Sequence, residues 1–193
     1  MENTTNVDAW LEEGYNLFAA EGVSGIQIER LARILQLNKS GFYHYFGDME
    51  GYWTELLHLH DKRAIDFMDE LREIATIEPD YFELVVRYKV PVMFQMQLRR
   101  SQDKYALFHK AAGRLDQKSS EILNPLWSRY LGVEDNPDLA LRYFEIVRDM
   151  FYARITFKEF DYSFLKRLVT EAKVVMQQIA DSNLQRTETQ TVN

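Results

Sequence analysis

The sequence has no cysteine and few residues that break helices, with four prolines and eight glycines among 193 residues. Without cysteine the chain cannot form a disulfide framework, a thiolate zinc site or a cysteine nucleophile, and it fits a reducing compartment. No apolar stretch approaches the roughly 18–20 residues that a membrane helix needs. The polar start, Met1–Asn6, lacks the basic and apolar regions of a signal peptide. These absences predict a soluble, cytoplasmic protein with no membrane segment.

Signals for β-strands are almost absent as well. The sequence has no sustained alternation of apolar and polar residues, no Asn-Gly or Asp-Gly turn and no glycine-rich loop. Apolar residues make up 46% of the chain, enough for a sizeable core, and they recur with the spacing of α-helices. The sequence therefore predicts an all-α protein of about nine helices.

The N-terminal region predicts three short helices. The first ends at Gly22 and Gly25, the second covers Gln27–Leu35 and the third covers Asn38–Tyr45. Asn38 can cap the first turn of the third helix with its side-chain oxygen. Because only two residues separate the second helix from the third, the region reads as a helix-turn-helix. That motif places one short helix in the major groove of DNA while its neighbour contacts the backbone.

The third helix has an apolar side and a polar side. Phe42 and Phe46 can face inward and hold this helix against the first two. Tyr43 and Tyr45 lie two positions apart and cannot share a face, so we assign Tyr45 to the core and Tyr43 to DNA. Gly41 lets the backbone approach a groove closely. The residues left facing outward suit base edges and phosphates: Asn38, Lys39, Ser40, Tyr43 and His44.

Charge is unevenly distributed over this region. Residues 1–60 contain three cations and nine acids, a net charge of -6, within a chain whose net charge is -7. From Arg30 to Gly47, however, there is no acid, while Arg33, Lys39 and His44 lie inside this stretch. The sequence therefore predicts a locally positive field at the third helix.

The run Trp10–Leu56 resembles the DNA-binding domain of the TetR family, ligand-responsive bacterial transcriptional regulators. The likeness is carried by Ile28–Ala32 and Leu37–Glu50. The family's Leu/Phe-Tyr-x-Tyr/His-Phe signature stands here as Phe42–Phe46, and its following glutamate as Glu50. The resemblance covers about the first 60 residues, and the rest of the chain matches the family only in its number of helices.

The resemblance implies DNA contacts at matching positions. In the family, the residue at Tyr43 typically reaches a backbone phosphate, and the residue at Lys39 reaches a phosphate or a base. Gln36 stands where the family usually has glycine, and Met49 where it usually has a lysine that contacts phosphate. Gln27 stands where a small hydroxyl residue is common. With Gly41 added from its place on the helix, the predicted DNA-binding residues are Gln27, Asn38, Lys39, Ser40, Gly41, Tyr43 and His44.

A larger helical body follows the helix-turn-helix. We expect a DNA-binding domain over residues 1–47, an effector-binding and dimerisation domain over 48–183, and a flexible tail over 184–193. Asp48 is a plausible cap for the long fourth helix, residues 48–74, which links the two domains. The further predicted helices are Tyr81–Met96, bent at Pro91, then Gln102–Lys110, Asp116–Tyr130, Pro137–Phe157 and Ser163–Asn183.

The body is rich in aromatic residues, which ordinary core packing explains for most of them. The alternative is that some line a pocket for a small apolar or amphipathic effector. The candidates for that pocket are Phe67, Tyr88, Phe94, Phe108, His109, Trp127, Phe151 and Arg154. The last two helices carry wide apolar stripes, and in the TetR family these helices usually form a four-helix dimer interface. The candidates for a homodimer interface are Tyr143, Val147, Met150, Leu168, Ala172, Val175, Met176 and Ile179.

No motif indicates an enzyme, a cofactor or a metal site. His58 and His60 would point about 200° apart on a helix, so they cannot both ligate one ion. We therefore predict a ligand-responsive transcriptional regulator, in the family commonly a repressor, that binds a palindromic operator in double-stranded DNA as a homodimer. The alternative is a helical protein-interaction module with a degenerate helix-turn-helix that no longer binds DNA tightly, which Met49 and the acidic N-terminal region favour.

Overall fold

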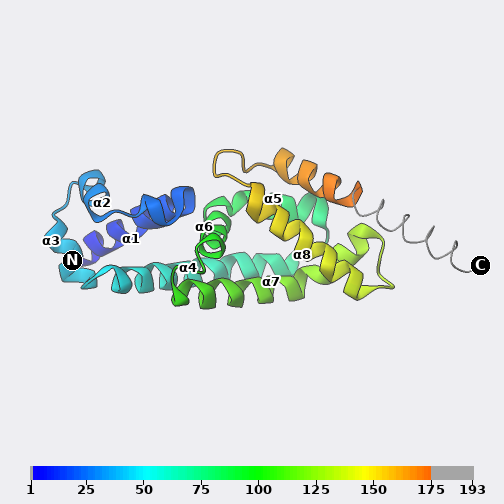
Figure 1. The fold of residues 1–193 in the computed structure, drawn as a ribbon, viewed down its shortest axis with the longest axis horizontal. Coiled ribbons are helices and arrows are strands. Elements are labelled where there is room, and N and C mark those ends of the chain that lie inside the picture. Colours follow the sequence, from blue (N-terminus) through cyan, green and yellow to red (C-terminus); the bar gives the residue numbers. More distant parts are fainter. Residues whose placement is uncertain (1, 175–193) are drawn as a thin grey trace, which may run out of the picture. The chain divides into compact units, whose positions relative to one another are not determined.

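The computed structural model describes residues 2–174, and within them every regular element is helical (Figure 1). Eight α-helices precede a last one whose described part covers residues 162–174, so the described chain has the all-α class and the nine helices predicted. None of the helices in this range is long and apolar enough to cross a membrane.

The helices follow one another with short connections. Their bounds are α1 Glu2–Glu21, α2 Ile28–Leu35, α3 Lys39–Phe46, α4 Met49–Glu73, α5 Phe82–Arg87, α6 Lys89–Arg100, α7 Ala106–Leu131 and α8 Pro137–Arg154. A short 3₁₀ turn, Gly22–Gly25, follows α1, and a π-type turn, Ile77–Tyr81, precedes α5.

Two predicted divisions between helices are wrong. The predicted helices Gln102–Lys110 and Asp116–Tyr130 form the single helix α7, which continues past Gly113. The predicted bend at Pro91 lies instead at Tyr88, between α5 and α6. Pro91 falls in the first turn of α6, where its missing N–H is not needed for an intrahelical hydrogen bond.

The ends of α3, α4 and α8 test the remaining local predictions. Asp48 caps α4, since its Oδ1 accepts a hydrogen bond from the Gly51 N–H at 2.9 Å. Asn38 precedes α3 in extended geometry, but its side chain makes no capping hydrogen bond, so that part of the prediction is wrong. The helix α8 ends at Arg154 rather than Phe157.

The chain forms two compact units. Among the described residues, the first unit comprises residues 2–74 together with Arg87–Ser119, and the second comprises Ala75–Val86 and residues 120–174. This division by packing differs from the division by function expected after residue 47, which stays a prediction.

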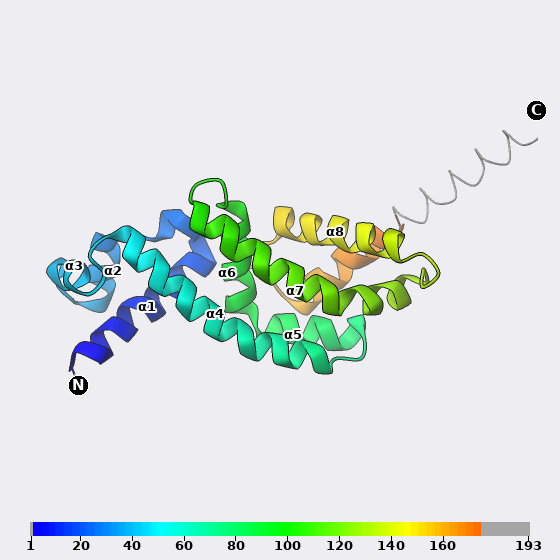
Figure 2. The same cartoon turned by 90° about the horizontal axis from the view of Figure 1, so that it is seen from below.

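The first unit is built around α1. Trp10, Tyr15 and Phe18 on this helix are fully buried. Tyr15 stacks on Phe94 of α6 with ring centroids 4.3 Å apart, and Phe18 meets Trp53 of α4 edge-on at 5.4 Å. The helix α6 lies beside both α1 and α4 (Figures 1 and 2). The three N-terminal helices are thereby fixed to α4 and α6 by a largely aromatic core.

Candidate DNA-binding surface

The turn between α2 and α3 has the tight geometry that a helix-turn-helix requires. Gln36 ends α2 in the left-handed region, with φ 57° and ψ 35°, and its N–H bonds back to the Arg33 carbonyl. Leu37 N–H then reaches the Ala32 carbonyl at 3.0 Å. A residue with a side chain costs roughly 1–2 kcal/mol in this conformation. The turn thus keeps the backbone shape that glycine would favour, although Gln36 occupies the position.

The apolar side of α3 is buried, as predicted. Phe42 is fully buried and meets Trp10 edge-on, with ring centroids 5.4 Å apart. Phe46 packs on Tyr52 of α4 at 4.9 Å. The Tyr52 hydroxyl donates to the Trp10 carbonyl at 2.7 Å, which ties α4 to α1 beneath α3. These contacts fix the face that α3 presents to solvent.

The opposite side of α3 is open. Tyr43 is 52% exposed, while Tyr45 is half-buried and so only partly in the core. Gly41 is half-exposed, and a Cβ there would meet only Tyr45 at an ordinary 3.6 Å. The remaining predicted DNA-binding residues are exposed: Gln27, Asn38, Lys39, Ser40 and His44. We call the exposed polar side of α3, together with Gln27 just before α2, the reading face.

The positive field expected at the reading face is largely neutralised. Arg30 donates two hydrogen bonds to the Glu21 carboxylate, at 2.5 and 2.7 Å. Lys39 Nζ lies 2.8 Å from Glu29 Oε1, and this hydrogen bond lowers the pKa of Glu29 and raises the pKa of Lys39. The acid-free stretch from Arg30 to Gly47 reveals neither pair, because Glu21 and Glu29 precede it in the sequence.

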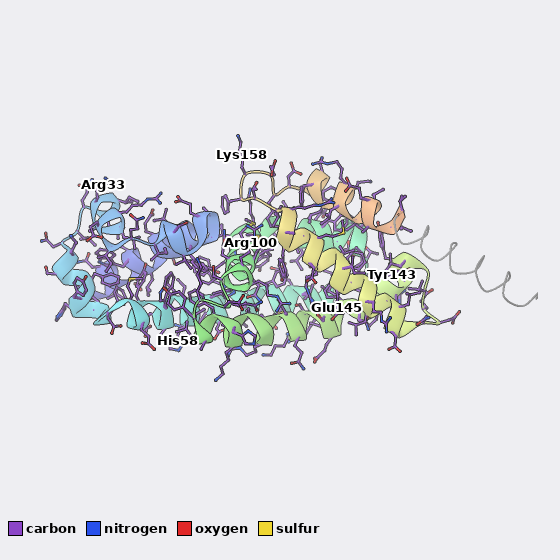
Figure 3. All side chains as sticks on the ribbon, viewed as in Figure 1. Arg33, His58, Arg100, Tyr143, Glu145 and Lys158 are labelled. Atoms are coloured by element: carbon purple, nitrogen blue, oxygen red, sulfur yellow. The ribbon has the colours of Figure 1, made fainter. Side chains whose placement is uncertain are left out.

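One cation near the reading face keeps its charge available. Arg33 is exposed and projects from α2 (Figure 3), and it makes no ion pair with other described residues. Phosphate contacts generally position a protein on DNA and supply its salt-dependent affinity. Arg33 is therefore a candidate phosphate contact that the sequence-based set of DNA-binding residues left out.

The predicted effector residues are distributed over both units. In the first, Phe94 and Phe108 are buried in the aromatic core, Phe67 meets Tyr88 at 5.4 Å, and His109 is exposed. This burial supports the core-packing alternative for Phe94 and Phe108.

In the second unit, Trp127 is buried beside Phe144, with ring centroids 6.0 Å apart. Phe151 is half-buried and lies 5.5 Å from Phe160. Arg154 is exposed and donates to Glu171 at 2.7 Å. These placements leave the effector pocket a prediction.

The predicted dimer residues differ in exposure. Val147, Leu168 and Ala172 are buried within this chain, and their place in a dimer interface stays a prediction. Tyr143 and Met150 are half-buried on α8, and Ile146 between them is 49% exposed. These three share one stripe of α8, on which Figure 3 marks Tyr143. Three further candidates lie outside the described residues: Val175, Met176 and Ile179.

Known proteins share this architecture. Residues 11–51 match the sequence model of the family described as "Bacterial regulatory proteins, tetR family". A structure from Mesorhizobium loti, assigned to the TetR family of transcriptional regulators, is 13% identical, with 93% of this chain and 98% of that chain covered and a TM-score of 0.56. A transcriptional regulator of the TerR/AcrR family from Aquifex aeolicus is 20% identical, with coverages of 88% and 98% and a TM-score of 0.56. No curated protein matches the sequence.

Proposed function

We propose, from the premise that this chain belongs to the TetR family of transcriptional regulators, that it represses transcription by binding a palindromic operator as a homodimer. A small apolar or amphipathic effector, bound by the helical body, releases it from DNA. The reading face supports the DNA-binding part of this proposal most strongly. Polar residues are exposed along one side of α3, while Phe42 and Phe46 anchor its other side.

The dimer follows from the size of α3. This helix has eight residues and can contact only a few base pairs, so one copy gives little specificity. Two copies held by a common body read half-sites about 34 Å apart, one turn of DNA. The stripe of Tyr143, Ile146 and Met150 on α8 is the apolar surface that we assign to the partner subunit.

The effector acts through the helices that hold the DNA-binding helices in place. The helix α4 begins directly after α3 and continues for 25 residues. A ligand that shifts α4 or α6 changes the distance between the two reading faces. Coupling between two such sites is typically about 1–3 kcal/mol, which changes DNA affinity roughly five- to 150-fold.

Selection of bound duplexes from a random DNA library tests the proposal and does not require a known operator. We expect enrichment of a palindromic sequence, followed by saturable, salt-sensitive binding in fluorescence anisotropy. Lys39→Ala and Tyr43→Phe should weaken this binding without lowering the melting temperature, because both side chains are exposed. Tyr105→Phe is the matched control, since Tyr105 is exposed but lies outside the three N-terminal helices.

The alternative function is a protein-interaction module that no longer binds DNA tightly. The pairing of Arg30 with Glu21 and of Lys39 with Glu29 favours it, because it leaves little free positive charge at the reading face. If selection enriches no sequence and anisotropy shows no binding at 50 mM salt, the regulator proposal is wrong and the alternative stands.

A further inference from the structure

Four polar side chains from four helices form one hydrogen-bonded chain inside the first unit. The Tyr15 hydroxyl on α1 lies 2.8 Å from His60 Nδ1 on α4. His60 Nε2 lies 3.1 Å from Gln95 Oε1 on α6. Gln95 Nε2 donates to the Ala112 carbonyl and to Asp116 Oδ1 on α7, each at 3.0 Å. These hydrogen bonds therefore connect α1 to α4, α4 to α6, and α6 to α7.

The direction of each hydrogen bond in this chain is determined. Because the Gln95 amide nitrogen faces two acceptors, its oxygen must face His60. His60 Nε2 must then carry the proton and donate, which leaves Nδ1 as an acceptor. The Tyr15 hydroxyl must donate to Nδ1. Only one tautomer of His60 satisfies both neighbours.

The surroundings favour this neutral form. His60 is 2% exposed and stacks on Phe94 with ring centroids 4.5 Å apart. Burial lowers the pKa of His60 to about 4 and raises the pKa of Tyr15.

Charged groups around this hydrogen-bonded chain of side chains are themselves paired. Arg63 covers the Tyr15 ring at 4.2 Å and bonds to Glu12, while Arg114 bonds to Asp61 at 2.6 Å. The Asp116 carboxylate at the end of the chain lies 3.0 Å from Arg99 Nε. A buried hydrogen-bonded network of this kind favours a single arrangement of the groups it joins.

The hydrogen-bonded network restricts the rotation and register of α1 more closely than the aromatic packing of this helix does. Ring contacts such as Tyr15–Phe94 hold α1 on α6 but are less directional than hydrogen bonds, which fix rotation and register. The same helix supports α3 through Trp10 and Phe42. A small rotation of α1 therefore moves the reading face.

We infer that His60 is a positioning residue for operator binding: through Tyr15 and Gln95 it fixes α1 on α6 and α7, and so sets the orientation of the reading face. This inference rests on the proposed function. The inference concerns how the two reading faces are placed relative to the two half-sites, because breaking the network leaves each reading face itself intact. The loss should therefore appear in full-site binding and not in half-site binding.

The test compares His60→Phe with His60→Gln in the full-length protein. Phenylalanine keeps a ring on Phe94 but removes both hydrogen bonds, whereas glutamine restores one acceptor and one donor. His58→Phe is the matched control, because His58 lies on the same helix with an exposed side chain (Figure 3). The probes are a selected palindromic duplex, a single half-site, and the palindrome with one inserted base pair, which shifts the half-sites by about 3.4 Å and 34–36°.

We expect His60→Phe to bind the palindrome about tenfold more weakly, within the five- to 150-fold range typical of such coupling. The loss of affinity that the inserted base pair causes should be smaller than in wild type, while half-site affinity stays within about twofold of wild type. His60→Gln should recover most of the loss, and His58→Phe should behave as wild type. A change confined to the melting temperature, with the ratio of palindrome to inserted-duplex affinity unchanged, would overturn the inference.

Tyr15→Phe keeps the test decisive if His60→Phe does not fold. It removes one hydroxyl and leaves the stack on Phe94, and we expect the same loss of discrimination between duplexes. If wild type discriminates the palindrome and Tyr15→Phe discriminates it equally, this inference alone fails. If wild type binds no duplex, the proposed function fails and the inference with it.

Discussion

Replacement of Glu29 by glutamine should strengthen non-specific DNA binding. In the free protein the Glu29 carboxylate lies 2.8 Å from Lys39 Nζ, and both side chains are exposed, 70% and 53% respectively. A DNA phosphate must displace this carboxylate before it can bind Lys39. Glu29→Gln removes the competing charge but keeps the size of the side chain. Because the ion pair is solvated, we expect no measurable change in the melting temperature.

The size of the effect follows from counterion release. Each phosphate neutralised on B-DNA steepens the dependence of log K on log salt by about 0.9. One additional lysine contact in each of two subunits steepens the slope by about 1.8, so raising salt from 50 to 200 mM costs the variant roughly twelvefold more affinity than wild type.

Fluorescence anisotropy on a random-sequence duplex at 50, 100 and 200 mM salt measures both slopes. Glu55→Gln is the control, because it removes the same charge from an exposed position on α4 away from Lys39. We expect the slope of Glu55→Gln to equal that of wild type. If Glu29→Gln gives the same slope as Glu55→Gln, then the pairing with Glu29 does not keep Lys39 from phosphate in non-specific complexes, and this reasoning is wrong.

Three changes should alter stability in defined directions. The pKa of His60 is about 6.5 in the unfolded chain and about 4 in the folded protein, so the unfolded chain takes up the proton first as the pH falls. The free energy of unfolding, measured with urea, should therefore fall by about 3 kcal/mol as the pH is lowered from 6.5 to 4. His60→Gln should remove that loss. Gly14→Ala should destabilise by about 1–3 kcal/mol, because a Cβ there would lie 1.8 Å from the Tyr52 hydroxyl oxygen. Gln36→Gly should stabilise by about 1 kcal/mol in thermal unfolding, since φ 57° costs glycine nothing, and an unchanged melting temperature would refute this.

The helix-turn-helix could be predicted because its determinants are local. Asp48 caps α4 within its own first turn, and Phe42 and Phe46 lie one turn apart on the buried side of α3. The prediction that Asn38 caps α3 was wrong although the residue type is suitable, because capping also needs a side-chain rotamer that the sequence does not specify. Gly113 does not interrupt α7, since a single glycine costs a helix only about 1 kcal/mol and buried Ala111 and Ala112 precede it.

The electrostatics of the site could not be predicted from the sequence. Lys39 meets Glu29, ten residues earlier, only because the turn at Gln36 brings α2 and α3 together. His60 is paired with residues 45 and 35 positions away, so its role depends on how α1 and α6 pack against α4. On the sequence alone, its spacing from His58 could only argue against a shared metal ion.

Hydroxyl-radical footprinting of a selected duplex, with wild type and with Tyr43→Phe, tests most directly whether two copies of α3 contact one stretch of DNA. We predict two protected tracts with centres about 10–10.5 base pairs apart, both weakened by Tyr43→Phe. A single protected tract, or protection that Tyr43→Phe leaves unchanged, would contradict the dimeric reading of DNA by this face.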